Sequence, residues 1–286
     1  MIDRNLHLID DPDEMLAVEA LQRLVWPGSE TEIVPAHMMI TAVHNGGIVI
    51  GAFEDRELIG FVLGFPGFYE TPAGLRLKHC SHMLGVHPDR RNTGLGFQLK
   101  RAQWQMVRHQ GIDRITWTYD PLLGRNAHLN ITRLGAVCST YRCNEYGELQ
   151  DGLNAGLPTD RFQVDWWVFS RRVEKRLDRG FRPTLQLDQV LCYELELPVL
   201  KTSSTGWLVP PGGVPALQGN MLLLEIPPDF SGLKAADHGL ALSWRQHTRL
   251  FFSEAFSAGY IVTDFIHDSG RSLYLLVHGE SRLGQD

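Results

Sequence analysis

The sequence has little cysteine and no long apolar run. Its 286 residues contain only four cysteines, Cys80, Cys138, Cys143 and Cys192, which is too few for a disulfide scaffold. None forms a Cys-x-x-Cys pair, so we expect free thiols and no metal site. The longest apolar stretches, such as residues 47–53, have the length of a strand, and the first residues lack a signal-peptide core. We therefore expect a cytoplasmic protein that does not enter a membrane.

The sequence also lacks an excess of positive charge. Its 27 Lys and Arg against 33 Asp and Glu give a net charge of −6, which argues against a nucleic-acid binder. Hydrophobic residues make up 43% and charged residues 21% of the chain, as in ordinary globular proteins, which excludes disordered, collagen-like and coiled-coil classes. The length allows one large domain or two ordinary ones.

The first half of the chain has the pattern of a mixed α/β fold. Hydrophobic periodicity and turn residues predict helices at 12–26, 35–44, 94–110 and 126–134, and strands at 47–53, 57–65, 77–86, 115–119 and 139–146. Residues 66–74, with two Pro and two Gly, are predicted to form a loop. This order predicts an antiparallel front part that leads into a βαβ centre.

The second half echoes part of the first. A shift of 140 residues places Pro88-Asp89 on Pro228-Asp229 and Trp104 on Trp244, in the same order of strand, loop and helix. Predicted elements here are strands at 161–169, 220–226, 260–266 and 272–277 and helices at 170–179 and 235–258. The echo predicts an ancient duplication whose second copy lacks the glycines of the first.

Residues 85–96 carry the clearest chemical motif. The strand ends at Val86, Pro88 follows, and Arg91, Gly94 and Gly96 precede the helix. Helix N-termini present unpaired N–H groups that suit a phosphate. The Gly-Lys-Ser/Thr of a P-loop is absent, and Leu99 stands where a dinucleotide-binding fingerprint needs its third glycine.

Arg91-x-x-Gly94-x-Gly96 after this strand resembles the acyl-CoA signature of the GNAT acyltransferase superfamily, and residues 1–147 match its order of elements. The resemblance implies that a CoA pyrophosphate is held by Arg91, Asn92, Thr93, Gly94, Leu95 and Gly96. It implies that backbone groups of Leu84, Gly85 and Val86 pair with pantetheine and polarise the thioester carbonyl, where the third strand splays from the next. Asn126 and Asn130 are further candidates for CoA contacts.

More loosely, the whole chain is similar to a GNAT-related family with two GNAT-like halves. Residues 81–86, 117–122, 126–127 and 157–161 carry this likeness. It implies transfer of an acetyl or succinyl group from an acyl-CoA onto an amino acid or another small primary amine. The expected domains are an acyltransferase domain at 1–165 and a degenerate GNAT-like domain at 166–286. A homodimer is compatible with this arrangement.

His82 is the first candidate for the base that takes a proton from the amine. The period of two places it on the same strand face as Leu84 and Val86, and an imidazole titrates near neutral pH; a structural histidine is the alternative. Asp120, at the end of the splayed strand, is a second base candidate or could orient the amine. Its alternative role is to cap the turn before Pro121.

The acid is harder to identify. GNAT enzymes often use a tyrosine at the position where this chain has Ile131, so Tyr119, Tyr141 and Tyr146 are the replacement candidates.

Asp160 and Arg161 are candidates for substrate binding. Arg161 could clamp a carboxylate, and a surface ion pair is the alternative.

Together these features predict an acyl-CoA-dependent N-acyltransferase. A CoA-binding module without activity and a structural or interaction protein are the two alternatives.

Overall fold

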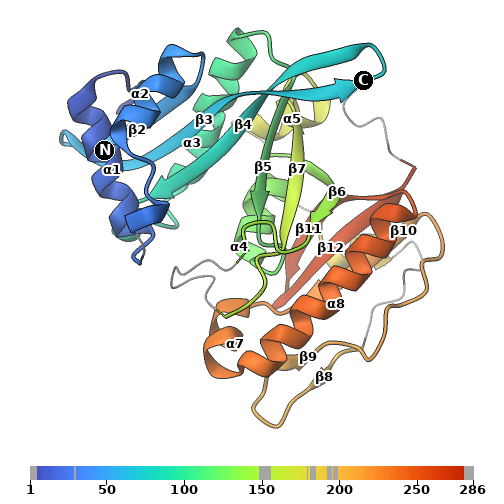
Figure 1. Cartoon of the computed structure of the whole chain (residues 1–286). Helices are drawn as coiled ribbons and strands as arrows, with labels where there is room; N and C mark the ends of the chain where they lie inside the picture. The colour runs from blue at the N-terminus through green and yellow to red at the C-terminus, as the bar shows by residue number, and fades with distance from the viewer. Residues whose placement is uncertain are drawn as a thin grey trace. The chain divides into compact units, whose positions relative to one another are not determined.

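The computed structural model describes residues 5–28, 30–147, 156–178, 180, 185–191, 195 and 199–279 (Figure 1). The backbone divides into two compact units, which are described separately. Among the described residues, unit 1 holds those up to Trp117 together with 167–169, and unit 2 holds the remainder from Thr118 onward. The predicted domains 1–165 and 166–286 follow a different division and stay a prediction.

Unit 1 is built on strands in the order β1-β2-β3-β4-β5. Only the β4–β5 pair is parallel. The bounds are β1 Asn5–Leu8, β2 Ile48–Glu54, β3 Glu57–Thr71, β4 Gly74–Val86 and β5 Arg114–Tyr119, of which the last two residues are counted in unit 2. β1 was not predicted, because four residues ahead of a helix give too short a pattern to recognise.

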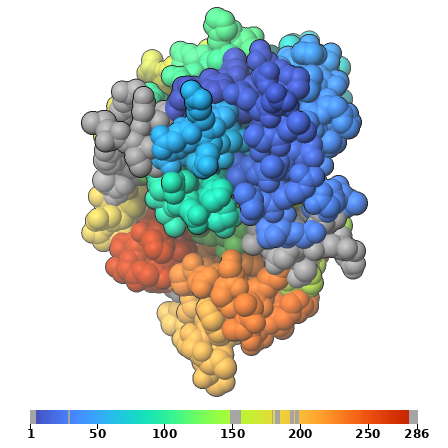
Figure 2. All heavy atoms as spheres, turned by 90° about the vertical axis from the view of Figure 1, so that its left-hand side faces the viewer, coloured from blue at the N-terminus to red at the C-terminus, as the bar shows by residue number. Residues whose placement is uncertain are grey.

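Helices cover both faces of these strands. α1 (Pro12–Val25) and α2 (Ala36–His44) pack on Phe61 and Leu63 of β3. On the opposite face, α3 (Leu95–His109) lies over Gly60, where an added Cβ would come within 3.1 Å of the Leu95 and Leu99 side chains. Figure 1 shows α1 and α2 beside β2 and β3, and Figure 2 shows the N-terminal elements, in blue, forming the surface on this side of unit 1.

The predicted loop at 66–74 is wrong, because β3 and β4 continue through it. Pro66 pairs with His79, and the two strands run on to the pair of Thr71 and Gly74. Pro66 breaks no ladder hydrogen bond, since β2 pairs with β3 only as far as Gly64 and leaves this edge of β3 open. Proline therefore argues against a strand only where that strand would be paired on both of its edges.

Unit 2 contains strands in the order β7-β6-β11-β12-β10 and a separate β8–β9 pair. The strands are β6 Val137–Arg142, β7 Arg161–Trp167, β8 Lys201–Thr202, β9 Leu208–Val209, β10 Met221–Ile226, β11 Tyr260–Asp268 and β12 Arg271–His278. The helices are α4 Gly124–Ala127, the π-helix His128–Arg133, α5 Arg171–Leu177, α6 Leu187–Leu191, α7 Phe230–Ala236 and α8 His238–Ser257. The predicted helix at 235–258 is thus α8 preceded by α7, with Asp237 as the N-cap of α8.

The echoed segments differ in strand arrangement. β4 pairs directly with β5, whereas β10 and β11 each pair with β12. The two tryptophans do keep one feature in common, because Trp104 donates to the carbonyl of Val168 at 2.9 Å and Trp244 to that of Leu208 at 2.8 Å. The structure therefore does not repeat one strand plan across this shift, and the duplication stays a prediction.

Cys80, Cys138 and Cys143 are free thiols. Cys192 and Arg179 of the predicted helix 170–179 lie outside the described residues. Within the described ranges, none of the helices is long and apolar enough to cross a membrane.

Candidate functional site

The turn from β4 leads into a start of α3 that no side chain caps. Gly94 precedes the helix with a φ of 81°, in the left-handed region that favours glycine. No side chain caps this end of α3, so its first N–H groups have no partner within the helix. A Cβ at Gly94 would meet no atom within 4 Å. The turn can therefore accept an anionic group against the helix N-terminus.

The two arginines of this turn are used differently. Arg90 is bound to the buried Glu54 carboxylate, with Nη2 2.6 Å from Oε2. Arg91 is exposed and donates a 3.4 Å hydrogen bond to the carbonyl of Val25. Thr93 Oγ1 donates to the Arg90 carbonyl at 2.8 Å and shapes the turn. Arg91 is thus better placed than Arg90 to contact an anion.

β4 separates from β5 after Cys80, in the region where the resemblance implies a splay. The two strands pair only at His79 with Ile115 and at Cys80 with Thr116. Residues 81–86, all of them described, continue to pair with β3 on the other edge. The backbone of Leu84, Gly85 and Val86 consequently faces no β5 partner and can hydrogen-bond a ligand.

Lys100 fills the interior next to this divergence. Its Nζ donates to Ser81 Oγ and Gln103 Oε1, both at 2.9 Å, and lies 3.6 Å from the ring centroid of Trp117. Burial lowers the pKa of Lys100 well below its usual value. Burial, followed by the charge of Lys100, lowers the pKa of the neighbouring His79 to about 3. These buried polar side chains join α3 to β4.

His82 sits at a β-bulge. Leu63 pairs with Met83 and Gly64 with Ser81, so His82 is the extra residue of β4. Bulges re-aim side chains and occur next to active sites.

The bulge corrects the prediction that His82 shares a face with Leu84 and Val86. His82 and Met83 are consecutive, yet both lie against α2 and Leu63, and Leu84 alternates to the opposite face. A strict period of two fails across the inserted residue.

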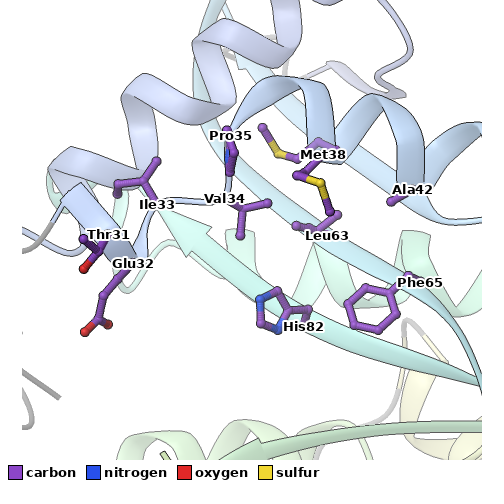
Figure 3. Close-up of a pocket in the computed structure, with 11 residues that line it drawn as sticks. Thr31, Glu32, Ile33, Val34, Pro35, Met38, Ala42, Leu63, Phe65 and His82 are labelled. Atoms are coloured by element: carbon purple, nitrogen blue, oxygen red, sulfur yellow. The ribbon is translucent and has the colours of Figure 1, made fainter. Parts of the chain in front are cut away.

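The re-aimed His82 lines a pocket of about 360 Å³ within unit 1 (Figure 3). The lining comes from the α1–α2 connection, α2, β3 and β4, and consists of Thr31, Glu32, Ile33, Val34, Pro35, Met38, Met39, Ala42, Leu63, Phe65 and His82. In Figure 3 the rings of His82 and Phe65 lie on the strand side of the pocket, and Met38 and Ala42 lie on the α2 side. An imidazole here faces a small, mostly apolar space.

The surroundings of His82 favour its neutral form. Its ring lies 5.8 Å from the ring of Phe65, measured between centroids. His82 is exposed to solvent, but loss of hydration against these apolar neighbours lowers the pKa of His82 below 6.5. His82 is therefore able to accept a proton at neutral pH.

Asp120, the second base candidate, lies in unit 2 in a buried ion pair. Its Oδ1 accepts hydrogen bonds from Arg245 Nη1 at 2.7 Å and from the backbone N–H of Leu122 at 2.9 Å. The latter bond is the turn-capping role that the sequence also suggests. Because Arg245 binds both carboxylate oxygens, Asp120 is the weaker candidate for a base.

Asp160 and Arg161 are buried, in contrast to the surface pair considered from the sequence. Asp160 accepts hydrogen bonds from Arg249 Nε at 2.8 Å, Arg249 Nη2 at 2.7 Å, Tyr141 Oη at 2.9 Å and the N–H of Asn144 at 2.9 Å. Burial by itself raises the pKa of Asp160, but the hydrogen bonds outweigh it and lower the pKa below 3.8. Arg161 donates to the Asp160 carbonyl at 3.0 Å and lies 3.9 Å from Asp120. Asp160 is thus a structural carboxylate in this network, and substrate binding by Arg161 stays a prediction.

The tyrosine candidates for the acid lie in unit 2. Burial raises the pKa of Tyr119 well above its usual value, and its hydroxyl is 3.3 Å from that of Tyr274. Burial also raises the pKa of Tyr141 well above 10, and its proton is donated to Asp160. Tyr146 is 49% exposed, with its hydroxyl 2.6 Å from Thr118 Oγ1. Tyr146 is the most accessible proton donor of the three.

The two asparagines predicted for CoA contacts are placed by the α4 region. Asn126 is half-buried at the end of α4, and Asn130 is buried in the π-helix that takes the place of most of the predicted helix 126–134. Ile131, where a tyrosine acid was expected, is completely buried. Among the described residues, no cluster of His, Cys, Asp or Glu could hold a metal ion.

The apolar residues that line the pocket were not predicted from the sequence. Met38 is 52% exposed and Phe65 38% exposed, although both are large and apolar. A signal was present in α2, whose apolar residues extend around the helix instead of forming one stripe, so that they cannot all face the core.

Part of the chain resembles known proteins. Residues 15–129 match the model of the Acetyltransferase (GNAT) family. A solved putative GNAT acetyltransferase from Desulfovibrio desulfuricans is 17% identical, with 58% of this chain and 99% of that chain covered at a TM-score of 0.45. The ribosomal-protein-S18-alanine N-acetyltransferase from Escherichia coli is 11% identical, with 58% and 94% covered at 0.44. A GNAT acetyltransferase from Elizabethkingia anophelis with acetyl-CoA bound is 15% identical, with 57% and 97% covered at 0.40. A comparison with curated proteins found no match.

Proposed function

Because residues 15–129 match the model of the GNAT acetyltransferase family, we propose that this chain transfers an acetyl or succinyl group from an acyl-CoA directly to the primary amine of a small molecule such as an amino acid. The observation that carries the proposal lies inside the matched residues. There the uncapped start of α3, the unpaired edge of β4 and the bulged His82 follow one another along the chain.

Each of these features supplies one requirement of acyl transfer. The N–H groups at the start of α3, with Arg91, suit the pyrophosphate of CoA. The backbone N–H groups of residues 84–86 suit pantetheine and the thioester oxygen, on which negative charge develops. His82 removes one proton from the ammonium, so that the amine nitrogen can form a bond to the acyl carbon while the C–S bond breaks.

The second proton of the amine must end on the departing thiolate. Tyr119 and Tyr141 are poor donors, because burial raises the pKa of each well above 10. We therefore favour Tyr146, whose hydroxyl belongs to an exposed side chain, over the other two.

Incubation with acetyl-CoA or succinyl-CoA and a panel of amines, followed by measurement of released thiol, tests the function. An enzyme releases thiol in an amine-dependent way and yields the matching amide. Calorimetric binding of CoA without release across the panel would instead identify a CoA-binding module. Absence of CoA binding at millimolar concentration would leave only a structural or interaction role.

Gly94→Ala tests the placement of the pyrophosphate. We expect CoA affinity to fall tenfold or more, or about 1.4 kcal/mol, because a methyl group would occupy the space that is open in the free protein. Gly111→Ala at the other end of α3 is the matched control, since Gly111 also has a positive φ of 72° and open space around its Cβ position. Both changes carry a similar backbone strain of about 1–2 kcal/mol. Equal CoA affinity of the two variants, measured by calorimetry, would refute this placement.

A further inference from the structure

The lining of the pocket beside His82 is mainly apolar. Met38 and Phe65 present exposed thioether and aromatic surface to this space, and Met39 and Leu63, which also line it, are themselves buried. Met39 and Leu63 belong to the buried core of unit 1, so this part of the pocket is held rigidly by packing. Met38, on the rim, is unbranched and can adapt to ligands of different shape.

The charged side chain that lines the pocket is acidic. Glu32 is the only acidic side chain among the eleven lining residues, and none of the eleven is a lysine or an arginine. Figure 3 shows Glu32 with Thr31 at one end of the pocket and Ala42 toward the other. An ammonium group is favoured in such a site, whereas a carboxylate placed in it would lack a cationic partner.

We propose that this pocket binds an apolar substituent of the amine acceptor, so that the preferred acceptors are small primary amines carrying an aliphatic, thioether or aromatic group close to the amino group. This inference rests on the proposed function for the identity of the reaction. The volume of about 360 Å³ lies at the small end of ligand pockets, which suits a single side chain. His82, in the same wall as Phe65, is then positioned beside the amine that the apolar group anchors.

Ala42 determines how far the pocket extends along α2. Its methyl group faces the space, and a leucine there would fill part of it. Thr41 is the neighbouring residue on the same helix, is exposed and does not line the pocket. Thr41→Leu is therefore a matched control that adds a side chain of the same size to α2 outside the site.

The test compares glycinamide, alaninamide and leucinamide, which share an α-amine and differ in the apolar substituent. With acetyl-CoA and thiol release as the measurement, kcat/KM is expected to rise at least about tenfold from glycinamide to leucinamide, the lower end of the effect of one buried methylene. Ala42→Leu is expected to reduce the leucinamide-to-glycinamide ratio about tenfold, mainly through KM, while Thr41→Leu retains the wild-type ratio. A flat panel, or an Ala42→Leu variant with an unchanged ratio, overturns the proposal.

The acyl chain of the donor is the competing occupant. A panel of acetyl-, butyryl- and hexanoyl-CoA with glycinamide separates the two, because only an acyl pocket would make Ala42→Leu change the preference for acyl length. Such a change with an unaltered amine ratio also overturns the proposal.

Direct binding separates this inference from the proposed function. Calorimetric titration of the full chain with leucinamide and with glycinamide measures the pocket without any transfer. If no acyl-CoA yields thiol with any amine, the proposed function fails, while tenfold tighter binding of leucinamide that is lost in Ala42→Leu still supports the pocket. Equal affinity for the two amines, or binding of neither, overturns it.

Discussion

Replacing Asp160 by asparagine is expected to lower the free energy of unfolding by about 3 kcal/mol. The side chain is completely buried, and its carboxylate accepts four hydrogen bonds, two from Arg249 and one each from Tyr141 and the Asn144 backbone. An amide keeps the shape but presents only one acceptor oxygen and removes the charge opposite Arg249. For a unit of this size the midpoint of thermal unfolding should fall by about 6–12 °C, as measured by calorimetry at pH 7.

Glu30→Gln provides the matched control in unit 1. Glu30 also binds an arginine through both oxygens, with Arg23 Nε 3.0 Å from each, but Glu30 is 71% exposed. The same carboxylate-to-amide change should therefore cost less than about 1 kcal/mol. If the two variants lose similar stability, the hydrogen bonds of Asp160 do not contribute the expected free energy of unfolding.

The stability difference caused by Asp160→Asn should also depend on pH. The folded-state pKa of Asp160 is lowered below 3.8, so the contribution of this carboxylate is fully present above the unfolded-state pKa. It is lost as pH falls from about 3.8 through the lower folded-state value. The gap between wild type and variant, measured by denaturant unfolding, should therefore be constant between pH 6 and 8 and shrink only in acid.

The sequence was sufficient wherever the physical signal is local. The turn that precedes α3 is encoded by Pro88 and by the glycines at 94 and 96, all within ten residues. The helix that follows has a clear amphipathic pattern, and the structure places it at Leu95–His109. Such features need no knowledge of distant residues, because backbone preference and hydrophobic spacing decide them.

Pairing between strands could not be predicted in the same way. Whether Pro66 ends a strand depends on where β2 stops, and the face on which His82 lies depends on an inserted residue opposite Leu63 and Gly64. Burial of Asp160 depends on Arg249, which is 89 residues away in the sequence. From the sequence alone, two adjacent charged residues such as Asp160 and Arg161 indicate an exposed position. Only the fold shows that both are buried.

Replacing His82 by glutamine should reduce kcat/KM for acyl transfer about 10²–10⁴-fold, the usual contribution of a general base. Glutamine has a similar size and polarity but cannot take a proton from an ammonium. Since His82 is the extra residue of a bulge and is exposed, the fold should tolerate the change. His37→Gln is the control, because His37 lies exposed on α2 and does not line the pocket.

The pH profile distinguishes loss of a base from loss of a contact. Burial lowers the pKa of His82 below 6.5, so wild-type kcat/KM for an ammonium substrate should fall as pH drops through that lowered value and be level above it. Without a base, only amine that is already deprotonated reacts. The rate of His82→Gln should then rise about tenfold per pH unit up to the pKa of the acceptor, which is about 8 for an α-amine such as that of leucinamide. A variant that keeps the level wild-type profile, with only a higher KM, would show that His82 contacts the acceptor without accepting its proton.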